Sequence, residues 1–176
     1  MRQILALARG DLDLLIALEA KKKPHMQDTL GIAAQLLEAG RSAEALDWVR
    51  KPGRRPFGAT DGELSPERVR LEARILDAMG DKSAAQALLW RCFEVSLSAD
   101  ILRDYLKQLP DFEDIEAEDR AQALALEKAE PEVALQFFLD WPRLDLAAKL
   151  IVMHPDRWDG GDWHILPKVA GLLGHD

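Results

Sequence analysis

Residues 32–46 read IAAQLLEAGRSAEAL, and residues 72–86 read EARILDAMGDKSAAQ. When the glycines of the two stretches are aligned, they come into register at an offset of 40 residues. Each copy then has a small residue, followed by a leucine, a glycine and a second small residue at the same spacing. The matching pairs are Ala33 and Ala73, Leu36 and Leu76, Gly40 and Gly80, and Ala45 and Ala85. This pattern indicates an internal repeat.

The spacing suits two antiparallel helices joined by a tight turn. Where two helices cross closely, a small side chain on each lets the backbones approach. Ala33 and Ala45 supply that pair in the first copy, and Ala73 and Ala85 supply it in the second. The glycine between them is expected to adopt the left-handed conformation that ends the first helix. Each copy is therefore predicted to be a helix-turn-helix unit.

Helical periodicity extends beyond the repeat. Apolar residues recur at three- and four-residue spacing over most segments between glycines and prolines. Strict alternation is scarce, and the residues that favour helices, Ala, Leu, Glu, Arg and Lys, dominate. Helices are predicted to open at Ser65-Pro66 and at Glu130-Pro131, because proline suits the first turn of a helix. We therefore predict an all-α protein without a sheet.

Composition excludes several classes of function. The chain has 31 Asp and Glu against 23 Lys and Arg, a formal net charge of −8 at pH 7. Nonspecific binding to nucleic acids or anionic membranes requires clustered Lys and Arg, so neither is expected. No segment has the roughly 20 apolar residues that span a bilayer, and the N-terminus shows no secretory signal pattern. We therefore expect a cytoplasmic protein that binds neither nucleic acid nor membrane.

The 176 residues suit one domain or a short array of repeats. We expect a single helical domain over residues 1–176. Its clearest repeat units lie at 27–50 and 66–96, and an irregular helical part follows at 99–176. Residues 51–64 contain two prolines and three glycines and are predicted to form a long loop between the units.

The first copy resembles a tetratricopeptide repeat, a helix-turn-helix unit of 34 residues. The resemblance rests on these residues: Ile32-Ala33, Leu36, Gly40-Arg41, Glu44-Ala45-Leu46 and Val49. The second copy has the same small and large positions, and the long loop accounts for the longer period. The aromatic residues usual in the first helix of such repeats are missing. The resemblance implies a tetratricopeptide-like solenoid, a right-handed α-α superhelix whose inner surface binds peptides or protein segments.

Three segments carry a closer resemblance, in this order along the chain: LLEAGR at 36–41, ALLWRCFE at 87–94 and YLKQLPDF at 105–112. They resemble an uncharacterised proteobacterial family of tetratricopeptide-like helical proteins. Related segments follow the zinc finger of bacterial SWIM-domain proteins, and that zinc finger has no counterpart in this sequence. The family has no known activity. The resemblance therefore implies a fold and a class of role, and it implies no catalytic residue.

The main concentration of basic residues lies at the long loop. Arg54, Arg55 and Phe57 lie within it, and Arg68 follows in the next predicted helix. Paired arginines suit carboxylate or phosphate groups, and long loops inserted between structural elements often carry function. The alternative is a solvated loop without a binding role. These four residues are our candidate partner-binding residues.

A second candidate site lies at 154–164, where two histidines and three aspartates gather: His154, Asp156, Asp159, Asp162 and His164. Their nitrogen and oxygen atoms suit a divalent metal ion. The spacing matches neither an EF-hand loop nor two histidines on one helix face. Helix capping by the aspartates accounts for the same residues. We therefore predict no metal or other cofactor and keep this site as the alternative.

Residues 111–119 hold six carboxylates. Negative charge favours the N-terminus of a helix, so this run is predicted to begin one. A docking surface for a basic partner is the alternative interpretation. Acid–base catalysis by paired carboxylates needs a pocket that separates their pKa values, and nothing in the sequence indicates such a pocket.

The sequence contains no recognisable nucleophile–histidine arrangement and no phosphate-binding or dinucleotide-binding glycine loop. We therefore expect a non-enzymatic protein–protein interaction module, with a protein or peptide as its unidentified partner. The loop with Arg54 and Arg55 and the acidic run at 111–119 are its expected docking features. The alternative is a metal- or small-ligand-binding protein or an enzyme with a site near 154–164. A third interpretation is a homodimer formed through an open end of the solenoid.

Overall fold

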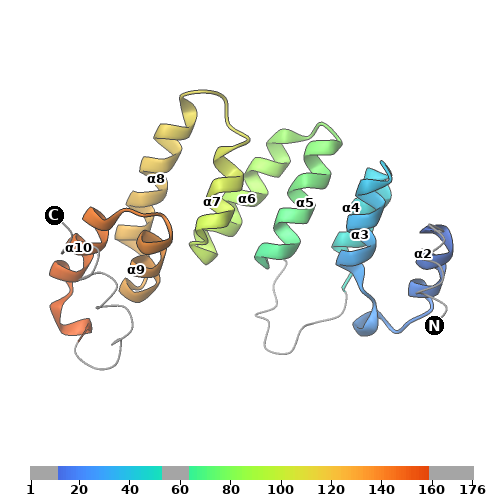
Figure 1. The fold of residues 1–176 in the computed structure, drawn as a ribbon, viewed down its shortest axis with the longest axis horizontal. Coiled ribbons are helices and arrows are strands. Elements are labelled where there is room, and N and C mark those ends of the chain that lie inside the picture. The colour runs from blue at the N-terminus through green and yellow to red at the C-terminus, as the bar shows by residue number, and fades with distance from the viewer. Residues whose placement is uncertain (1–11, 53–63, 159–176) are drawn as a thin grey trace. The chain divides into compact units, whose positions relative to one another are not determined.

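The computed structural model describes residues 12–52 and 64–158, and helices are the only regular secondary structure within these ranges (Figure 1). The all-α prediction is therefore confirmed. The α-helices are α2 (Leu12–Ala20), α3 (Thr29–Glu38), α4 (Ser42–Arg50), α5 (Pro66–Ala78), α6 (Lys82–Ser96), α7 (Ala99–Leu106), α8 (Glu113–Lys128), α9 (Pro131–Asp140) and α10 (Leu144–Met153). Two 3-10 helices, Pro24–Met26 and Pro155–Arg157, follow α2 and α10. As predicted, α5 and α9 open with proline.

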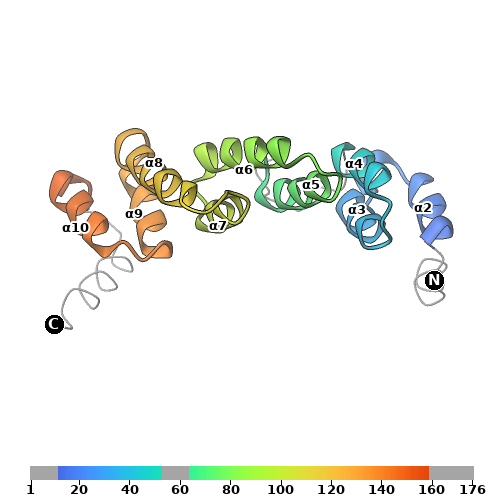
Figure 2. The same ribbon diagram turned by 90° about the horizontal axis from the view of Figure 1, so that it is seen from above.

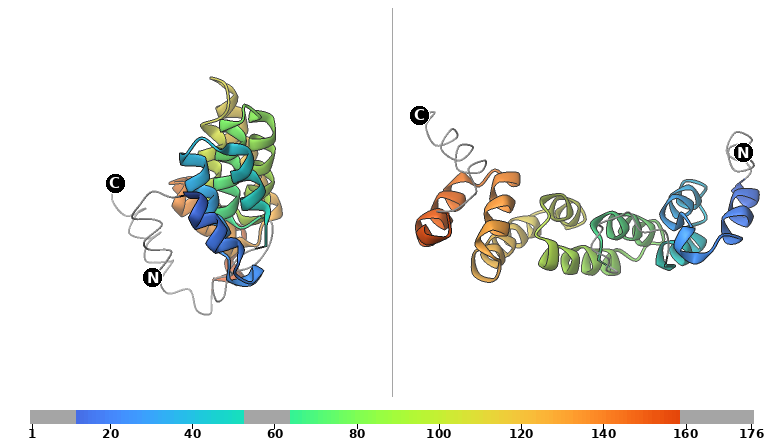
Figure 3. Two further views of the ribbon diagram at one scale, coloured as in Figure 1. Left: turned by 90° about the vertical axis from the view of Figure 1, so that its right-hand side faces the viewer. Right: turned by 90° about the horizontal axis from the view of Figure 1, so that it is seen from below.

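The chain divides into two compact units, Met1–Cys92 and Phe93–Asp176. The first unit contains α2 to α5 and most of α6, and the second contains the end of α6 and α7 to α10. Within the first unit α3 and α4 lie side by side, and within the second α9 and α10 do so (Figures 2 and 3). Each unit has its own set of buried apolar side chains.

The turn between α3 and α4 has the geometry that its glycine predicts. Gly40 has a φ of +75°, in the left-handed region where a residue with a Cβ is strained. Its N–H donates to the carbonyl of Leu37 (3.0 Å), and the N–H of Arg41 donates to the carbonyl of Leu36 (2.9 Å). These two bonds form a Schellman motif. They end α3 and allow the chain to return as α4.

The turn between α5 and α6 is closed in the same way. Gly80 has a φ of +85°. Its N–H donates to the carbonyl of Asp77 (2.9 Å), and the N–H of Asp81 donates to that of Leu76 (2.9 Å). At both turn glycines a Cβ would meet no atom within 4 Å. The backbone angle, and not a lack of space, is therefore what favours glycine at these turns.

The remaining positions of the repeat are buried in both copies. None is more than 6 % exposed: Ala33, Leu36 and Ala45 in the first copy, and Ala73, Leu76 and Ala85 in the second. The prediction of two helix-turn-helix units with small residues buried at these positions is confirmed. In each pair the leucine lies in the last turn of the first helix.

The core of the first unit is formed by residues from α2 to α5: Leu15, Ile32, Ala33, Leu36, Ala45, Trp48, Val49, Leu71 and Ile75. An ion pair joins α4 to α5 beside this core. The Nε of Arg50 donates to the carboxylate of Glu72 at 2.7 Å. Glu72 is buried, whereas the Arg50 side chain is more than half exposed, so water partly screens this pair.

Helix α2 is attached to the first helix pair by polar contacts. The buried carboxylate of Glu19 accepts a hydrogen bond from the backbone N–H of Asp28, the residue that caps α3 (2.7 Å). Arg41 donates to Asp13 of α2 (2.6 Å) and twice to Glu44 of α4 (2.7 Å each). The hydrogen bonds from Arg41 lower the pKa of the Glu44 carboxyl below its ordinary value. One guanidinium therefore links two helices that are distant in sequence.

The core of the second unit contains a group of aromatic rings. The ring of Phe137 lies 5.4 Å from that of Phe93 in a T-shaped arrangement and 5.3 Å from that of Phe138, between ring centroids. It also stacks on the ring of Trp141 at 6.2 Å. The three phenylalanines are at most 2 % exposed. Because aromatic pairs at these distances add to the gain from burial, Phe137 is a central contributor to this core.

Helices α9 and α10 form a further pair that was not predicted from the sequence. The N–H of Arg143 donates to the carbonyl of Phe138 (2.9 Å), the same closure across six residues that ends α3 and α5. Pro142 stands where the first two turns have glycine. The first small residue of the repeat is replaced by Leu135, and the leucine is replaced by Phe138. The second small residue is Ala147. All three are fully buried. The irregular part expected at 99–176 therefore contains a helix pair of related construction.

Candidate functional site

The candidate residues at the long loop are described only in part. Arg54, Arg55 and Phe57 lie outside the described residues. Arg68 lies near the start of α5 and is partly exposed. Its Nε atom is buried and has no hydrogen-bond partner among the residues that the structure describes. The predicted grouping of the four residues into one binding site stays a prediction.

The candidate metal ligands are likewise described only in part. His154 is the residue that ends α10, and its backbone N–H closes the last turn. The backbone of Asp156 lies in the 3-10 helix that follows. Its side chain lies outside the described part, as do Asp159, Asp162 and His164. Within 12–52 and 64–158, no group of three or more His, Cys, Asp or Glu side chains is placed to hold a metal ion.

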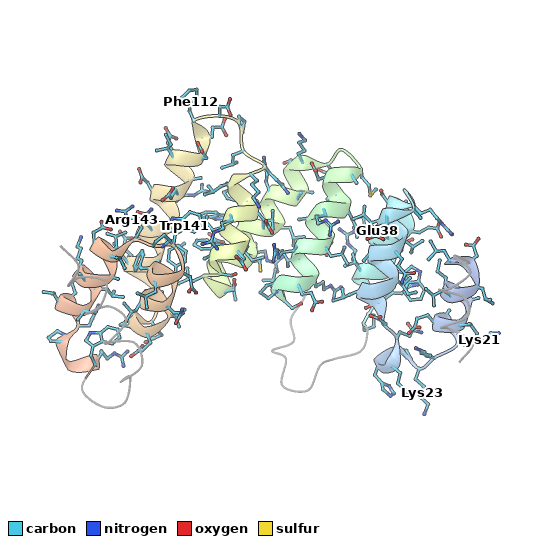
Figure 4. All side chains as sticks on the ribbon, in the orientation of Figure 1. Lys21, Lys23, Glu38, Phe112, Trp141 and Arg143 are labelled. Atoms are coloured by element: carbon cyan, nitrogen blue, oxygen red, sulfur yellow. The ribbon has the colours of Figure 1, made fainter. Side chains whose placement is uncertain are left out.

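The acidic run forms an exposed surface where α7 is joined to α8. Residues 111–116 read DFEDIE, and all six are exposed. We call this surface the acidic tip; it contains four carboxylates together with Phe112 and Ile115. Helix α8 begins at Glu113, as the charge pattern predicted. Phe112 lies at the outer end of the turn (Figure 4).

Phe112 has an unusual backbone conformation and an exposed ring. Its φ of +76° and ψ of −22° lie in the left-handed region, which costs a residue with a Cβ roughly 1–2 kcal/mol. It is the N-cap residue of α8, and its side chain makes no capping hydrogen bond, because only a polar side chain accepts one there. The residue is 82 % exposed. Neither capping nor burial therefore accounts for a phenylalanine at this position.

Ile115, in the first turn of α8, is 60 % exposed. A helix start often pairs two apolar side chains across its first turn, one before the cap and one four residues into the helix. Asp111 and Glu116 occupy these two positions, so the apolar residues of the tip do not serve this purpose. From the sequence, this run was interpreted by its charge alone. Two apolar residues inside it were the available signal for this surface.

None of the four carboxylates of the acidic tip forms an ion pair with a side chain that the structure describes. The basic residues of α7 and its end have acidic partners on the same helix. Arg103 donates to Asp100 (2.9 Å), and Lys107 donates to Asp104 (3.4 Å). Three of the tip carboxylates lie in the first turn of α8, where they also favour the positive end of the helix dipole. The acidic tip therefore presents uncompensated negative charge beside exposed apolar groups.

Replacing Phe112 with asparagine is expected to raise the free energy of unfolding by about 1 kcal/mol. Asparagine tolerates the left-handed conformation better than most residues with a Cβ, so the change relieves part of the strain at this position. Denaturant unfolding followed by circular dichroism measures the change. Phe112→Leu, which keeps the strain and lacks a cap, is the control and is expected to change stability by less than about 0.5 kcal/mol. Equal stability of the two variants would contradict this interpretation of the turn.

A polar network in the second unit joins α8 to the turn between α9 and α10. Glu118 Oε1 accepts hydrogen bonds from Gln122 Nε2 (2.7 Å) and from Trp141 Nε1 (2.9 Å). The Arg143 guanidinium donates to the side-chain oxygen of Gln122, and the Arg103 guanidinium lies 5.2 Å from the Trp141 ring centroid. Figure 4 shows Trp141 and Arg143 near each other at this turn. The network was not predicted from the sequence, because its members come from distant segments.

Arg143 also binds Asp145 through two hydrogen bonds, from Nε (2.9 Å) and Nη2 (2.8 Å). These bonds lower the pKa of the Asp145 carboxyl from 3.8 to about 2. A lowered pKa means that the ionised carboxylate stabilises the folded state. This contribution is complete above pH 3.8 and is lost as the pH falls through about 2.

In the Arg143→Gln variant, the pKa of Asp145 is expected to rise toward 3.8. A carbon-13 NMR titration of the Asp145 carboxyl measures it directly. Arg50→Gln is the matched control, because Arg50 pairs with Glu72 in the first unit and should leave the Asp145 titration unchanged. A pKa near 3.8 for Asp145 in the unmodified protein would show that the bidentate pair does not persist in solution.

These features define an all-α protein of helix-turn-helix pairs with an exposed acidic tip. No helix within the described ranges is long and apolar enough to cross a membrane. The whole chain, residues 1–176, matches a family of unknown function (DUF6880), and the protein belongs to that family. No curated protein and no solved structure matched the chain. The expected membership of an uncharacterised family is confirmed.

Proposed function

We propose that this protein is a non-enzymatic protein–protein interaction module built of tetratricopeptide-like helix pairs. The observation that carries the proposal is the repeat itself. Two helix pairs, α3–α4 and α5–α6, end their first helices with the same hydrogen bonds and bury the same positions, 40 residues apart. Repeated helix pairs bury one face against their neighbours and leave another face for binding. The α9–α10 pair, with its similar closure, supports the same interpretation.

The docking features in this proposal are the acidic tip and the loop that contains Arg54 and Arg55. The acidic tip supports the proposal because it exposes apolar side chains that contribute nothing to the core. A solenoid arrangement of the pairs and a bacterial cytoplasmic setting belong to the same proposal. Both rest on the resemblance to the tetratricopeptide-like bacterial family.

Affinity capture tests the proposed function. The full chain is immobilised, and proteins retained from a lysate of its source cells are quantified by mass spectrometry. An Arg54→Glu/Arg55→Glu variant is run in parallel. We expect at least one protein to be retained reproducibly and to be competed by excess free chain.

Loss of that protein in the double variant would assign its binding to the loop, and retention would assign it to another surface such as the acidic tip. Failure to retain any competed protein in replicate captures would contradict the proposal. Metal bound in stoichiometric amount to the purified chain would then favour the alternative site at 154–164.

A further inference from the structure

We propose that the acidic tip binds a segment of a partner protein that is rich in Lys and Arg and also carries apolar side chains. The inference rests on the proposed function and names the partner chemistry of one of its surfaces. Two kinds of side chain carry it. The tip contains uncompensated carboxylates and an exposed apolar pair within six consecutive residues, 111–116.

The charge of the tip favours a cationic partner. Each of its four carboxylates is exposed, and none is paired with a basic side chain in the described parts of the chain. The basic residues at the adjacent helix, Arg103 and Lys107, already have acidic partners. Arg143, elsewhere in the same unit, binds Asp145. The tip therefore attracts cationic groups of another molecule, and it repels phosphate-bearing partners such as nucleic acids or anionic membranes.

The apolar pair narrows the partner to a protein segment. Phe112 and Ile115 expose large apolar surfaces to water, and their burial by apolar side chains of the partner is favourable. An aromatic face also attracts a Lys ammonium or an Arg guanidinium. Phe112 stands at the outer end of its turn, where an approaching chain reaches it (Figure 4). A segment with both cationic and apolar side chains is complementary to both features.

The start of α8 does not account for this combination. Carboxylates in the first helical turn favour the helix dipole, but they do not require Phe112 beside them. The phenylalanine gives no capping hydrogen bond, and it adopts a strained conformation with its ring in water. Stability alone favours glycine, asparagine or aspartate at this position, because these residues adopt the left-handed conformation at lower cost. Binding supplies the role that stability leaves without explanation.

A peptide-binding experiment with the full chain tests the inference. The probe is a fluorescein-labelled peptide of repeated Lys-Leu-Arg triplets, and the control probe has Glu in place of every Lys and Arg. Fluorescence anisotropy measures the dissociation constant at about 0.05 M and about 0.3 M salt. We expect the basic peptide to bind, the acidic peptide not to bind, and the higher salt concentration to weaken binding because it screens the carboxylates.

Matched variants locate the binding surface. Glu113→Gln/Asp114→Asn/Glu116→Gln removes three charges from the tip, and Glu38→Gln/Glu67→Gln/Asp77→Asn removes three exposed charges elsewhere. Phe112→Asn removes the ring, and Val152→Asn removes an equally exposed apolar side chain from α10. Each tip variant is expected to weaken peptide binding at least about tenfold, and each control less than about twofold. Because Phe112→Asn is expected to stabilise the fold, its loss of binding cannot come from unfolding.

Three outcomes would overturn the inference: no binding of the basic peptide, equal weakening by tip and control variants, or equal binding of the two probes. A fourth is concentration-dependent self-association in sedimentation experiments that the tip variants abolish while the peptide does not bind. In that case the occupant of the tip is a second copy of the chain. If affinity capture yields a competed partner while the peptide fails to bind, the proposed function stands and only this inference fails.

Discussion

Replacing Phe137 with alanine is expected to lower the free energy of unfolding by about 3–5 kcal/mol. The ring is 2 % exposed and lies against those of Phe93, Phe138 and Trp141. Its removal leaves a cavity among these rings. The loss therefore has two parts: the free energy gained by burying the ring, and the contacts that the neighbouring side chains make with it.

Denaturant unfolding, followed by tryptophan fluorescence and by circular dichroism, measures this change. Val133→Ala is the control on the same helix, since Val133 is half exposed, and its effect should stay within about 0.5 kcal/mol. If Phe137→Ala costs no more than Val133→Ala, the aromatic core of the second unit is not formed in solution.

Replacing Ala45 with leucine is expected to lower the free energy of unfolding by about 1–3 kcal/mol. Ala45 is fully buried on α4, in the core cluster that also includes Ala33 of α3. A larger side chain there forces α3 and α4 apart or into strained rotamers. The equivalent change in the second copy, Ala85→Leu, is expected to have a similar effect because Ala85 is equally buried.

Two exposed alanines on the same helices provide matched controls. Ala43→Leu on α4 and Ala87→Leu on α6 make the same substitution where the side chain faces water. Their melting temperatures should stay close to that of the unmodified protein, whereas those of the two core variants should fall. If each core variant melts at the same temperature as its control, the alanines are not at helix crossings and the repeat register is wrong.

The repeat could be predicted from the sequence because local chemistry determines it. A glycine that must adopt a positive φ ends a helix, and small residues at fixed distances on both sides mark the crossing. Gly40 and Gly80 have these conformations, and the predicted positions are buried. The third pair could not be found in this way. Pro142 replaces the glycine there, and Leu135 and Phe138 replace smaller residues, so the turn is recognised only from its hydrogen bond.

The acidic tip also combines a feature that could be predicted from the sequence with one that only the structure shows. The charge of residues 111–119 correctly predicted a helix start, because the helix dipole is a local effect. Phe112 and Ile115 are visible in the sequence as apolar residues within the run, but an apolar residue next to a helix start is usually buried against it. Only the structure shows that these two stay outside the core. The network of Glu118, Gln122, Trp141 and Arg143 was also beyond sequence reasoning, because it brings together side chains from α8 and the α9–α10 turn.

By itself, the sequence determined the helical class, the two repeated pairs and the family to which the chain belongs. The first two follow from propensity, spacing and residue type within a few turns of helix, whereas the family follows from a match along the whole chain. Only the tertiary structure decided which apolar residues are buried and which face water, and which charges find partners. Those outcomes depend on contacts between helices that are distant in sequence, and the acidic tip is recognised as a surface because such contacts do not cover it.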